Sequence, residues 1–211
     1  MYALRRRLRN RRNGSERGSV LIELTLVTPL FIMMVMGMLE LGVAWRDSIT
    51  VTQASRQGAR VGSHLGDASA GTLAATTRPE QELLLSLRTV LTPEEGQIQY
   101  VVVYNSDANG GMVAACDPRI QATPTSVNGQ CNVYTGAQLT TIIANDSQWN
   151  SKGNCTAGLA DTAWCPTMRS NSDEYLGVYV QFERPKVTGF FGTGSYELKA
   201  TTVMRIEPEY S

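Results

Sequence analysis

The sequence predicts an α+β protein, in which a long N-terminal helix that can cross a membrane precedes a small antiparallel-sheet head domain with a Cys-containing loop region. Three observations indicate this fold: a long apolar run near the N-terminus, strand-like apolar runs further on, and four cysteines confined to one polar stretch. We expect a basic leader at 1–18, a long helix at 19–64 and the head domain at 65–211.

Charge is distributed unevenly along the chain, although the 211 residues sum to zero. Residues 1–18 hold seven Arg and one Glu, a net charge of +6, and the remainder carries −6. We expect residues 1–17 to have no regular structure. A free-standing basic arm binds nucleic acid through phosphates. Directly before an apolar run, it more plausibly contacts anionic lipid and keeps the leader in the cytoplasm, so we predict no nucleic-acid partner.

The apolar run is interrupted by two carboxylates, Glu23 and Glu40. The sixteen residues between them, Leu24–Leu39, carry no charge, which is fewer than the ~18–20 that a clean span requires. A transmembrane half at 20–45 is long enough if the carboxylates are tolerated. A removed secretory signal peptide is the alternative. Signal peptides have a shorter apolar region that is followed by an A-x-A-like cleavage site. The apolar run of this chain is longer, and no such site follows it.

A proline lies inside this run. Pro29 removes one helical hydrogen bond and usually bends a helix. We expect the hydroxyls of Thr25 and Thr28 to cover the backbone groups that it frees.

The helical pattern continues beyond the apolar run with small residues at every fourth position. Small side chains on one helix face allow another backbone to come close. We expect Ala54, Gly58 and Gly62 to pack closely against a sheet or a neighbouring helix. The alternative is a loose helix end weakened by glycine.

The head domain contains patterns for two helices and three strands. An amphipathic helix is expected at 79–91 and a short one at 137–146. Strands are expected at 97–105, 175–184 and 196–206, the last alternating between apolar and polar residues. These strands can form an antiparallel sheet with the helices on one face. A turn that carries two aromatic residues, Gly189-Phe190-Phe191-Gly192, connects the last two strands.

The four cysteines indicate disulfides in an exported domain. Three pairings are open, and we favour Cys116–Cys131 and Cys155–Cys165 because each closes a short loop. A zinc site is the alternative. The sequence has no C-x-x-C spacing and only one histidine, His64, so we predict no metal.

No catalytic motif stands out. The chain lacks G-x-S-x-G, a phosphate loop with Lys, and H-E-x-x-H. A Ser/His/Asp triad would depend on His64, which we expect to be a surface or packing residue, and Gly192–Ser195 is expected to be a turn. We predict a protein that is not an enzyme and has no cofactor.

The segment Gly18-Ser19-Val20-Leu21-Ile22-Glu23 resembles the start of type IV pilins and pseudopilins, in which a basic leader ends in Gly and Glu is the fifth residue after the cut. A narrower resemblance is to TadE-like proteins, minor pilins or pseudopilins of the tight-adherence (Tad or Flp) pilus. It covers about residues 17–63 and rests on the following residues: Glu23-Leu24, Pro29, Gly37, Glu40, Gly42, Ala54 and Gly58-Ala59-Arg60. The head resembles no family that we can name.

The resemblance implies a site of processing and a site of assembly. A prepilin peptidase would cut between Gly18 and Ser19. The Glu23 carboxylate would pair with the new Ser19 amine of an adjacent subunit, or it snorkels unpaired at the membrane edge. Pro29 and Glu40 would also serve subunit assembly. Glu40 would lie at the outer interface or pair with a basic residue of another subunit.

The resemblance also implies the setting. The chain would be a single-pass protein of the bacterial inner membrane with its head on the far side, and it would contribute to adhesion. Its partners would be other pilin subunits, the inner-membrane assembly platform, the peptidase and lipids. The alternative is an anchored, unprocessed binding module, an adhesin or receptor, whose loop at 106–174 recognises a surface or carbohydrate.

Overall fold

The computed structural model divides into two compact units, and the helix α1 contributes to both. We call Met1–Ala44 with Lys186–Gly194 the anchor unit, and Trp45–Pro185 with Ser195–Ser211 the head unit. Side chains are not described at 2–17, 79 and 141–144. The residues that the structure describes are 2–64, 79–91, 97–144, 164, 169, 175–189 and 192–206.

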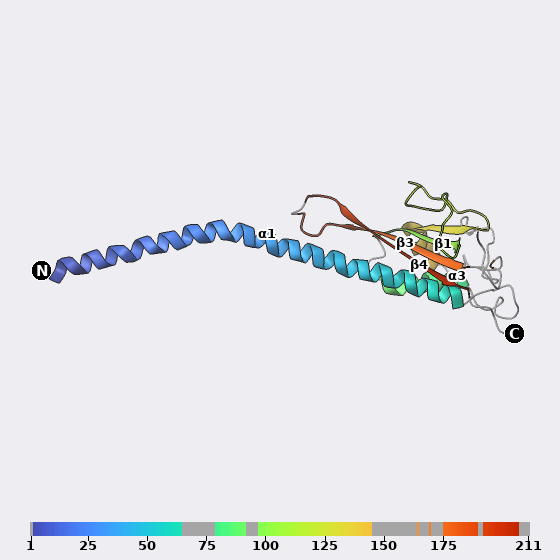
Figure 1. Ribbon diagram of the computed structural model, residues 1–211, viewed down its shortest axis with the longest axis horizontal. Coiled ribbons are helices and arrows are strands. Elements are labelled where there is room, and N and C mark those ends of the chain that lie inside the picture. Colours follow the sequence, from blue (N-terminus) through green and yellow to red (C-terminus); the bar gives the residue numbers. More distant parts are fainter. Residues whose placement is uncertain are drawn as a thin grey trace. The chain divides into compact units, whose positions relative to one another are not determined.

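Helix α1 runs from Tyr2 to His64 and includes the predicted long helix (Figure 1). The expectation that residues 1–17 have no regular structure is wrong, because the helical backbone begins at Tyr2. Arg is a good helix former. Extending an existing helix also avoids the cost of nucleation, since each added residue gains one hydrogen bond.

The head unit contains a four-stranded antiparallel sheet with the strand order β2-β1-β3-β4. The strands are β1 (Ile98–Ser106), β2 (Cys131–Thr135), β3 (Tyr175–Pro185) and β4 (Ser195–Arg205). Three of them confirm the predicted strands. Strand β2 was not predicted: it has five residues, and its first four are all buried, so it shows no alternation.

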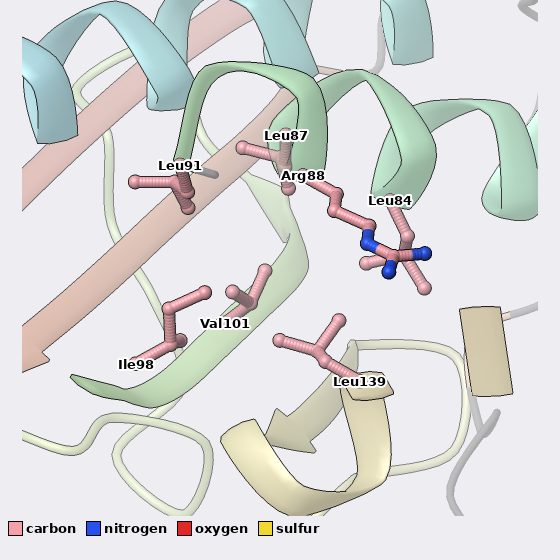
Figure 2. A pocket seen from close by; sticks show the side chains of 7 residues that line it. All are labelled: Leu84, Leu87, Arg88, Leu91, Ile98, Val101 and Leu139. Atoms are coloured by element: carbon pink, nitrogen blue, oxygen red, sulfur yellow. The ribbon is translucent and has the colours of Figure 1, made fainter. Parts of the chain in front are cut away.

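The helices that follow α1, together with the last part of α1, pack on one face of the sheet and form the main apolar core with it. Helix α3 (Pro79–Leu91) confirms the predicted amphipathic helix, and α4 (Gly136–Ala144) confirms the short one. Val101 and Val103 of β1 face this core. A gap of about 10 Å³ remains beneath α3 (Figure 2), which is room for one water at most. Its lining residues are Leu84, Leu87, Arg88, Leu91, Ile98, Val101 and Leu139.

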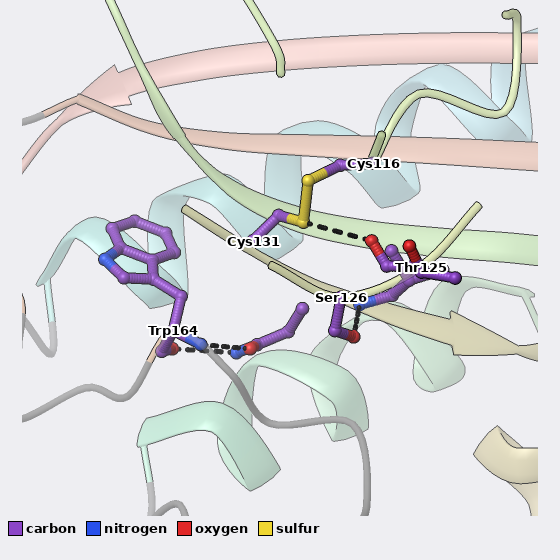
Figure 3. Close-up of a disulfide and its surroundings, with 7 residues drawn as sticks. Cys116, Thr125, Ser126, Cys131 and Trp164 are labelled. Carbon is purple, nitrogen blue, oxygen red and sulfur yellow. Dashed lines mark hydrogen bonds between the residues drawn. A yellow bond between two sulfur atoms is a disulfide. The ribbon is translucent and has the colours of Figure 1, made fainter. Parts of the chain in front are cut away.

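The opposite face of the sheet is covered by the loop after β1. Val102 and Tyr104, which alternate with the residues that face the helices, belong to a second apolar cluster on this face. Cys116 of the loop and Cys131 of β2 are both fully buried in this cluster and form a disulfide (Figure 3). The disulfide therefore ties the loop directly to an edge strand.

Candidate functional site

The apolar part of α1 exposes its side chains instead of burying them. The helix Gly18–His64 is long and apolar enough to cross a membrane, and its most apolar stretch of 18 residues has none of its residues buried. Soluble proteins rarely leave so large a contiguous apolar surface uncovered. Between Gly18 and Ala44, the exposed large apolar residues are Val20, Leu21, Ile22, Leu24, Leu26, Val27, Leu30, Phe31, Ile32, Met33, Met34, Val35, Met38, Leu39 and Leu41.

Gly18, Ser19 and Glu23 lie on this exposed helix surface. Ser19 and Glu23 are four positions apart, so both are on one face of α1. Among the side chains that the structure describes, Glu23 has no hydrogen-bond or ion-pair partner. Both the predicted processing position and this carboxylate are therefore open to another molecule.

The hydroxyls near Pro29 bond within the helix. Thr25 Oγ1 donates to the Ile22 carbonyl at 2.8 Å, and Thr28 Oγ1 donates to the Leu24 carbonyl at 2.6 Å. Each threonine hydroxyl therefore has a hydrogen-bond acceptor within the helix, as a polar side chain in apolar surroundings requires. The expectation that they cover the group freed by Pro29 is wrong, because that group is the carbonyl of Thr25 itself.

Glu40 is held by a segment distant in sequence. It is 3% exposed, although Leu39 and Leu41 beside it are 56% and 70% exposed. Its Oε1 accepts a hydrogen bond from the Val187 amide at 3.0 Å. Its Oε2 accepts bonds from the amide and the hydroxyl of Thr188 at 2.9 and 2.8 Å. The carboxylate of Glu40 thus accepts hydrogen bonds from Val187 and Thr188 of its own chain, and no sequence pattern predicted these partners.

These donors belong to the tip of the β3–β4 hairpin, Lys186–Gly194. The tip is closed by a hydrogen bond from the Lys186 amide to the Gly194 carbonyl at 3.0 Å and by one from the Gly192 amide to the Gly189 carbonyl at 3.2 Å. Val187 is 61% exposed. The tip and the apolar helix together form the anchor unit.

A second link between α1 and the hairpin lies in the head unit. Arg184 Nη1 of β3 is 2.8 Å from Asp47 Oδ2 of α1. The side chain of Asp47 is 4% exposed and that of Arg184 is 19% exposed. An ion pair so far removed from water is screened less by salt than a surface pair.

The small residues of α1 lie where α1 meets α3 and the sheet. Ala54 is fully buried. A Cβ added at Gly58 would lie 2.9 Å from Leu87 Cδ2, and one added at Gly62 would lie 2.5 Å from Leu83 Cδ1. The absence of a side chain at these glycines therefore permits the close approach of α3.

A buried polar cluster, which the sequence did not reveal, lies at the start of α3. Glu80 Oε1 accepts hydrogen bonds from Asn132 at 3.0 Å and Tyr134 at 2.9 Å, and Oε2 pairs with Arg169 at 2.5 Å. The guanidinium carbon of Arg169 lies 4.5 Å from the centre of the Trp164 ring, and Trp164 is drawn in Figure 3. This cluster joins α3 to strand β2 and to Arg169, which is a structural role.

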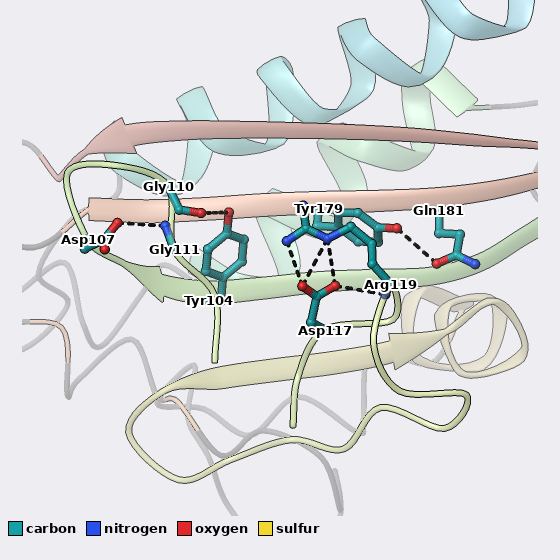
Figure 4. Close-up of polar contacts among 8 residues, drawn as sticks. All are labelled: Tyr104, Asp107, Gly110, Gly111, Asp117, Arg119, Tyr179 and Gln181. Carbon is teal, nitrogen blue, oxygen red and sulfur yellow. Dashed lines mark hydrogen bonds and ion pairs between the residues drawn. The ribbon is translucent and has the colours of Figure 1, made fainter. Parts of the chain in front are cut away.

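A second polar cluster covers the loop face of the sheet (Figure 4). Arg119 donates to both carboxylate oxygens of Asp117 at 2.7–3.0 Å, and this pairing holds the pKa of Asp117 below its usual range. Burial raises the pKa of Tyr179 to about 12. The Tyr179 hydroxyl donates to Gln181 at 3.1 Å. The guanidinium carbon of Arg119 lies 5.6 Å from the centre of the Tyr179 ring, so the ion pair packs on a phenol that is neutral at physiological pH.

The described residues contain no group of three or more His, Cys, Asp or Glu side chains that could hold a metal ion. His64 is exposed at the end of α1. Cys155 and Cys165, which were predicted to pair, lie outside the described residues.

In a comparison with protein families, residues 18–60 match the model of a family described as TadE-like protein. The matched segment includes Gly18, Glu23, Glu40 and the small residues as far as Gly58. No curated protein and no solved structure gives a significant match.

Proposed function

With α1 identified as TadE-like over residues 18–60, we propose that this chain is a membrane-anchored minor pilin or pseudopilin that is needed to assemble a Tad-type pilus and contributes to adhesion. The observation that carries the proposal is the uncovered apolar surface of α1, on which Glu23 is exposed and unpaired among the described side chains. Such a surface is stable in lipid or against other helices of the same kind.

Glu23 is the residue that distinguishes assembly from simple anchoring. A charged side chain inside a membrane costs at least about 2.5 kcal/mol when it is placed at the centre of a helix. Cleavage after Gly18 creates a positive amine on Ser19 at neutral pH. In a bundle of such helices, the Glu23 carboxylate of one subunit pairs with the Ser19 amine of the next. The pair forms only when the two helices are correctly staggered, so it fixes their register.

The proposal includes orientation and partners. The seven Arg of the leader stay in the cytoplasm, and the head, with its disulfide, lies in the oxidising space beyond the membrane. The partners are a prepilin peptidase, other pilin or pseudopilin subunits, the inner-membrane assembly platform and membrane lipids. No enzymatic activity and no nucleic-acid partner are proposed.

Replacing Glu23 tests this function. We expect Glu23→Ala to insert into the membrane at the level of the unmodified chain and to be lost from purified pili. Glu82→Ala is the matched control, because Glu82 is an exposed carboxylate of α3 in the head unit. Incorporation of Glu23→Ala at the normal level would contradict the proposed role.

The second candidate function is an anchored binding module that keeps its leader. The observation in its favour is the disulfide-tied loop of residues 107–127, in which Ile120 is 64% exposed. An exposed loop that is attached to the sheet by a disulfide suits recognition of a surface or carbohydrate. This candidate predicts that Glu23→Ala leaves function unchanged, because the binding would depend on the head alone.

A further inference from the structure

Val187 and Thr188 of the hairpin tip are hydrogen-bonded to Glu40, at the C-terminal end of the charge-free run of α1. The described residues of α1 from Gly18 to Val35 are all exposed, and the first ones that are partly covered are Met36 and Gly37. Glu40, one turn further on, is bonded to the tip. The hydrogen bonds between the tip and α1 are thus made at the residue that directly follows the charge-free run.

The length of the helix sets the depth of this contact. Residues 19–40 span about 33 Å at ~1.5 Å per residue, and a hydrocarbon core is about 30 Å thick. When the start of the run lies at one edge of the bilayer, Glu40 lies at the other edge. The tip bonded to Glu40 is then level with the far interface of the membrane.

The chemistry of the contact suits that position. Glu40 would be costly near hydrocarbon as a bare charge, but its carboxylate accepts three hydrogen bonds. The same bonds satisfy the amides of Val187 and Thr188, which a turn in lipid would otherwise leave without partners. The same hydrogen bonds thus satisfy both the carboxylate of Glu40 and the two backbone amides of the tip.

The composition of the tip favours lipid. Val187 is 61% exposed while its amide is turned to Glu40. The sequence joins Gly189 to Gly192 through two Phe, and their placement lies outside the described residues. Aromatic residues are typical of the interfacial layer.

We propose that the hairpin tip is a second membrane contact of this protein, which lies in the interfacial layer of the bilayer beside α1 and is held there by Glu40. The exposed side of the tip, where Val187 lies, contacts lipid in this proposal. This inference rests on the membrane-spanning part of the proposed function and goes beyond it, because it gives the tip of the β3–β4 hairpin a membrane contact of its own.

Photocrosslinking in vesicles tests the proposal. The full chain carries benzoylphenylalanine at position 187, is reconstituted in phosphatidylethanolamine and phosphatidylglycerol vesicles, and is illuminated. We expect a lipid adduct, detected as an increase in peptide mass. The same probe replaces Leu30, which is 69% exposed in the charge-free run, as the positive control. Ile120, which is 64% exposed in the head unit, is the matched negative control.

The outcomes separate the two proposals. An adduct at 30 without one at 187 overturns the contact of the tip and leaves the membrane span intact. No adduct at either position overturns both. Equal yields at 187 and 120, or a crosslink from 187 to a second protein chain in place of lipid, also overturn the assignment of the tip to lipid.

A second variant tests the role of Glu40. Glu40→Gln preserves the size of the side chain and removes its charge. We expect the lipid adduct at 187 to fall about tenfold, because one hydrogen bond to a charged group changes an equilibrium by that order. The adduct at 30 should not change. An undiminished yield at 187 would show that Glu40 does not hold the tip at the membrane.

Discussion

Thr188 donates two hydrogen bonds to Glu40 Oε2, one from its amide at 2.9 Å and one from its hydroxyl at 2.8 Å. The two residues are separated by 148 positions in the sequence. This contact joins the apolar helix to the β3–β4 hairpin within the anchor unit. It gives a carboxylate in the apolar helix a partner in its own chain, whereas Glu23 has none among the side chains that the structure describes.

The protection of the Thr188 and Val187 amides should depend on Glu40. We expect Glu40→Ala to raise their hydrogen-exchange rates by about one to two orders of magnitude, because hydrogen bonds to charged groups contribute about 1.5–3 kcal/mol. Hydrogen exchange followed by NMR or mass spectrometry of the full chain in detergent measures this. Glu23→Ala should leave both rates unchanged, and equal rates in all three proteins would contradict the contact.

A side chain at Gly58 should destabilise the head unit. We expect Gly58→Val to lower the free energy of unfolding by about 1–3 kcal/mol, the usual cost of overpacking, because a Cβ there would lie 2.9 Å from Leu87 Cγ and Cδ2. Thermal unfolding followed by near-UV circular dichroism measures the change.

Gly42→Val is the matched control for this prediction, since a Cβ at Gly42 has no atom within 4 Å. Its unfolding temperature should equal that of the unmodified protein. If Gly58→Val unfolded at that temperature as well, the close packing of α1 against α3 would be disproved.

The disulfide should stabilise the loop that covers the second face of the sheet. Cys116 and Cys131 are separated by 15 residues, and closing a loop of this size contributes about 3 kcal/mol. We expect the double variant Cys116→Ser, Cys131→Ser to lose about that amount in urea unfolding. A loss below about 1 kcal/mol would mean that the apolar cluster holds the loop without the bond.

Cys155 and Cys165 provide a comparison. The sequence predicts that they pair with each other, so a non-reducing peptide map should contain a fragment that joins them and a separate one that joins Cys116 to Cys131. A fragment that joins Cys155 to Cys131 would refute both pairings.

Asp117 should make the stability of the head depend on acid pH. Arg119 lowers the pKa of Asp117 in the folded protein. Stability from this pair is therefore present above the unfolded pKa, near 3.9, and is lost as the pH falls through the lower folded pKa. Asp117→Asn should flatten the pH dependence of urea unfolding below about pH 4. Arg119→Gln should flatten it too, and an unchanged slope in both variants would contradict the pairing.

The sequence predicted the fold well where local patterns carry it. Leucines at helical spacing predicted α3, and the valines of QIQYVVVYN predicted β1. Strand β2 was not predicted because its first four residues are all buried, so apolar and polar residues do not alternate. Its burial depends on the disulfide-tied loop and on the Glu80 cluster, whose residues are distant in the sequence.

For the candidate site, the sequence likewise predicted the features that local composition determines and missed those that depend on distant residues. Apolar composition predicted a membrane-spanning helix, and Glu23 and Glu40 were identified as the two carboxylates that interrupt it. The partners of Glu40 were not predictable, because backbone amides at 187 and 188 carry no sequence signal and become donors only when the hairpin turns back to α1. The pairing of Glu80 with Arg169 was missed because the two side chains are 89 positions apart and meet only in the folded chain.

The mature N-terminus tests the central claim most directly. The chain is purified from membranes of a bacterium that assembles Tad pili, and its intact mass and first residue are determined. The proposed function predicts a chain that begins with Ser19 and has lost the leader with its seven Arg. A functional chain that still carries residues 1–18 would contradict it.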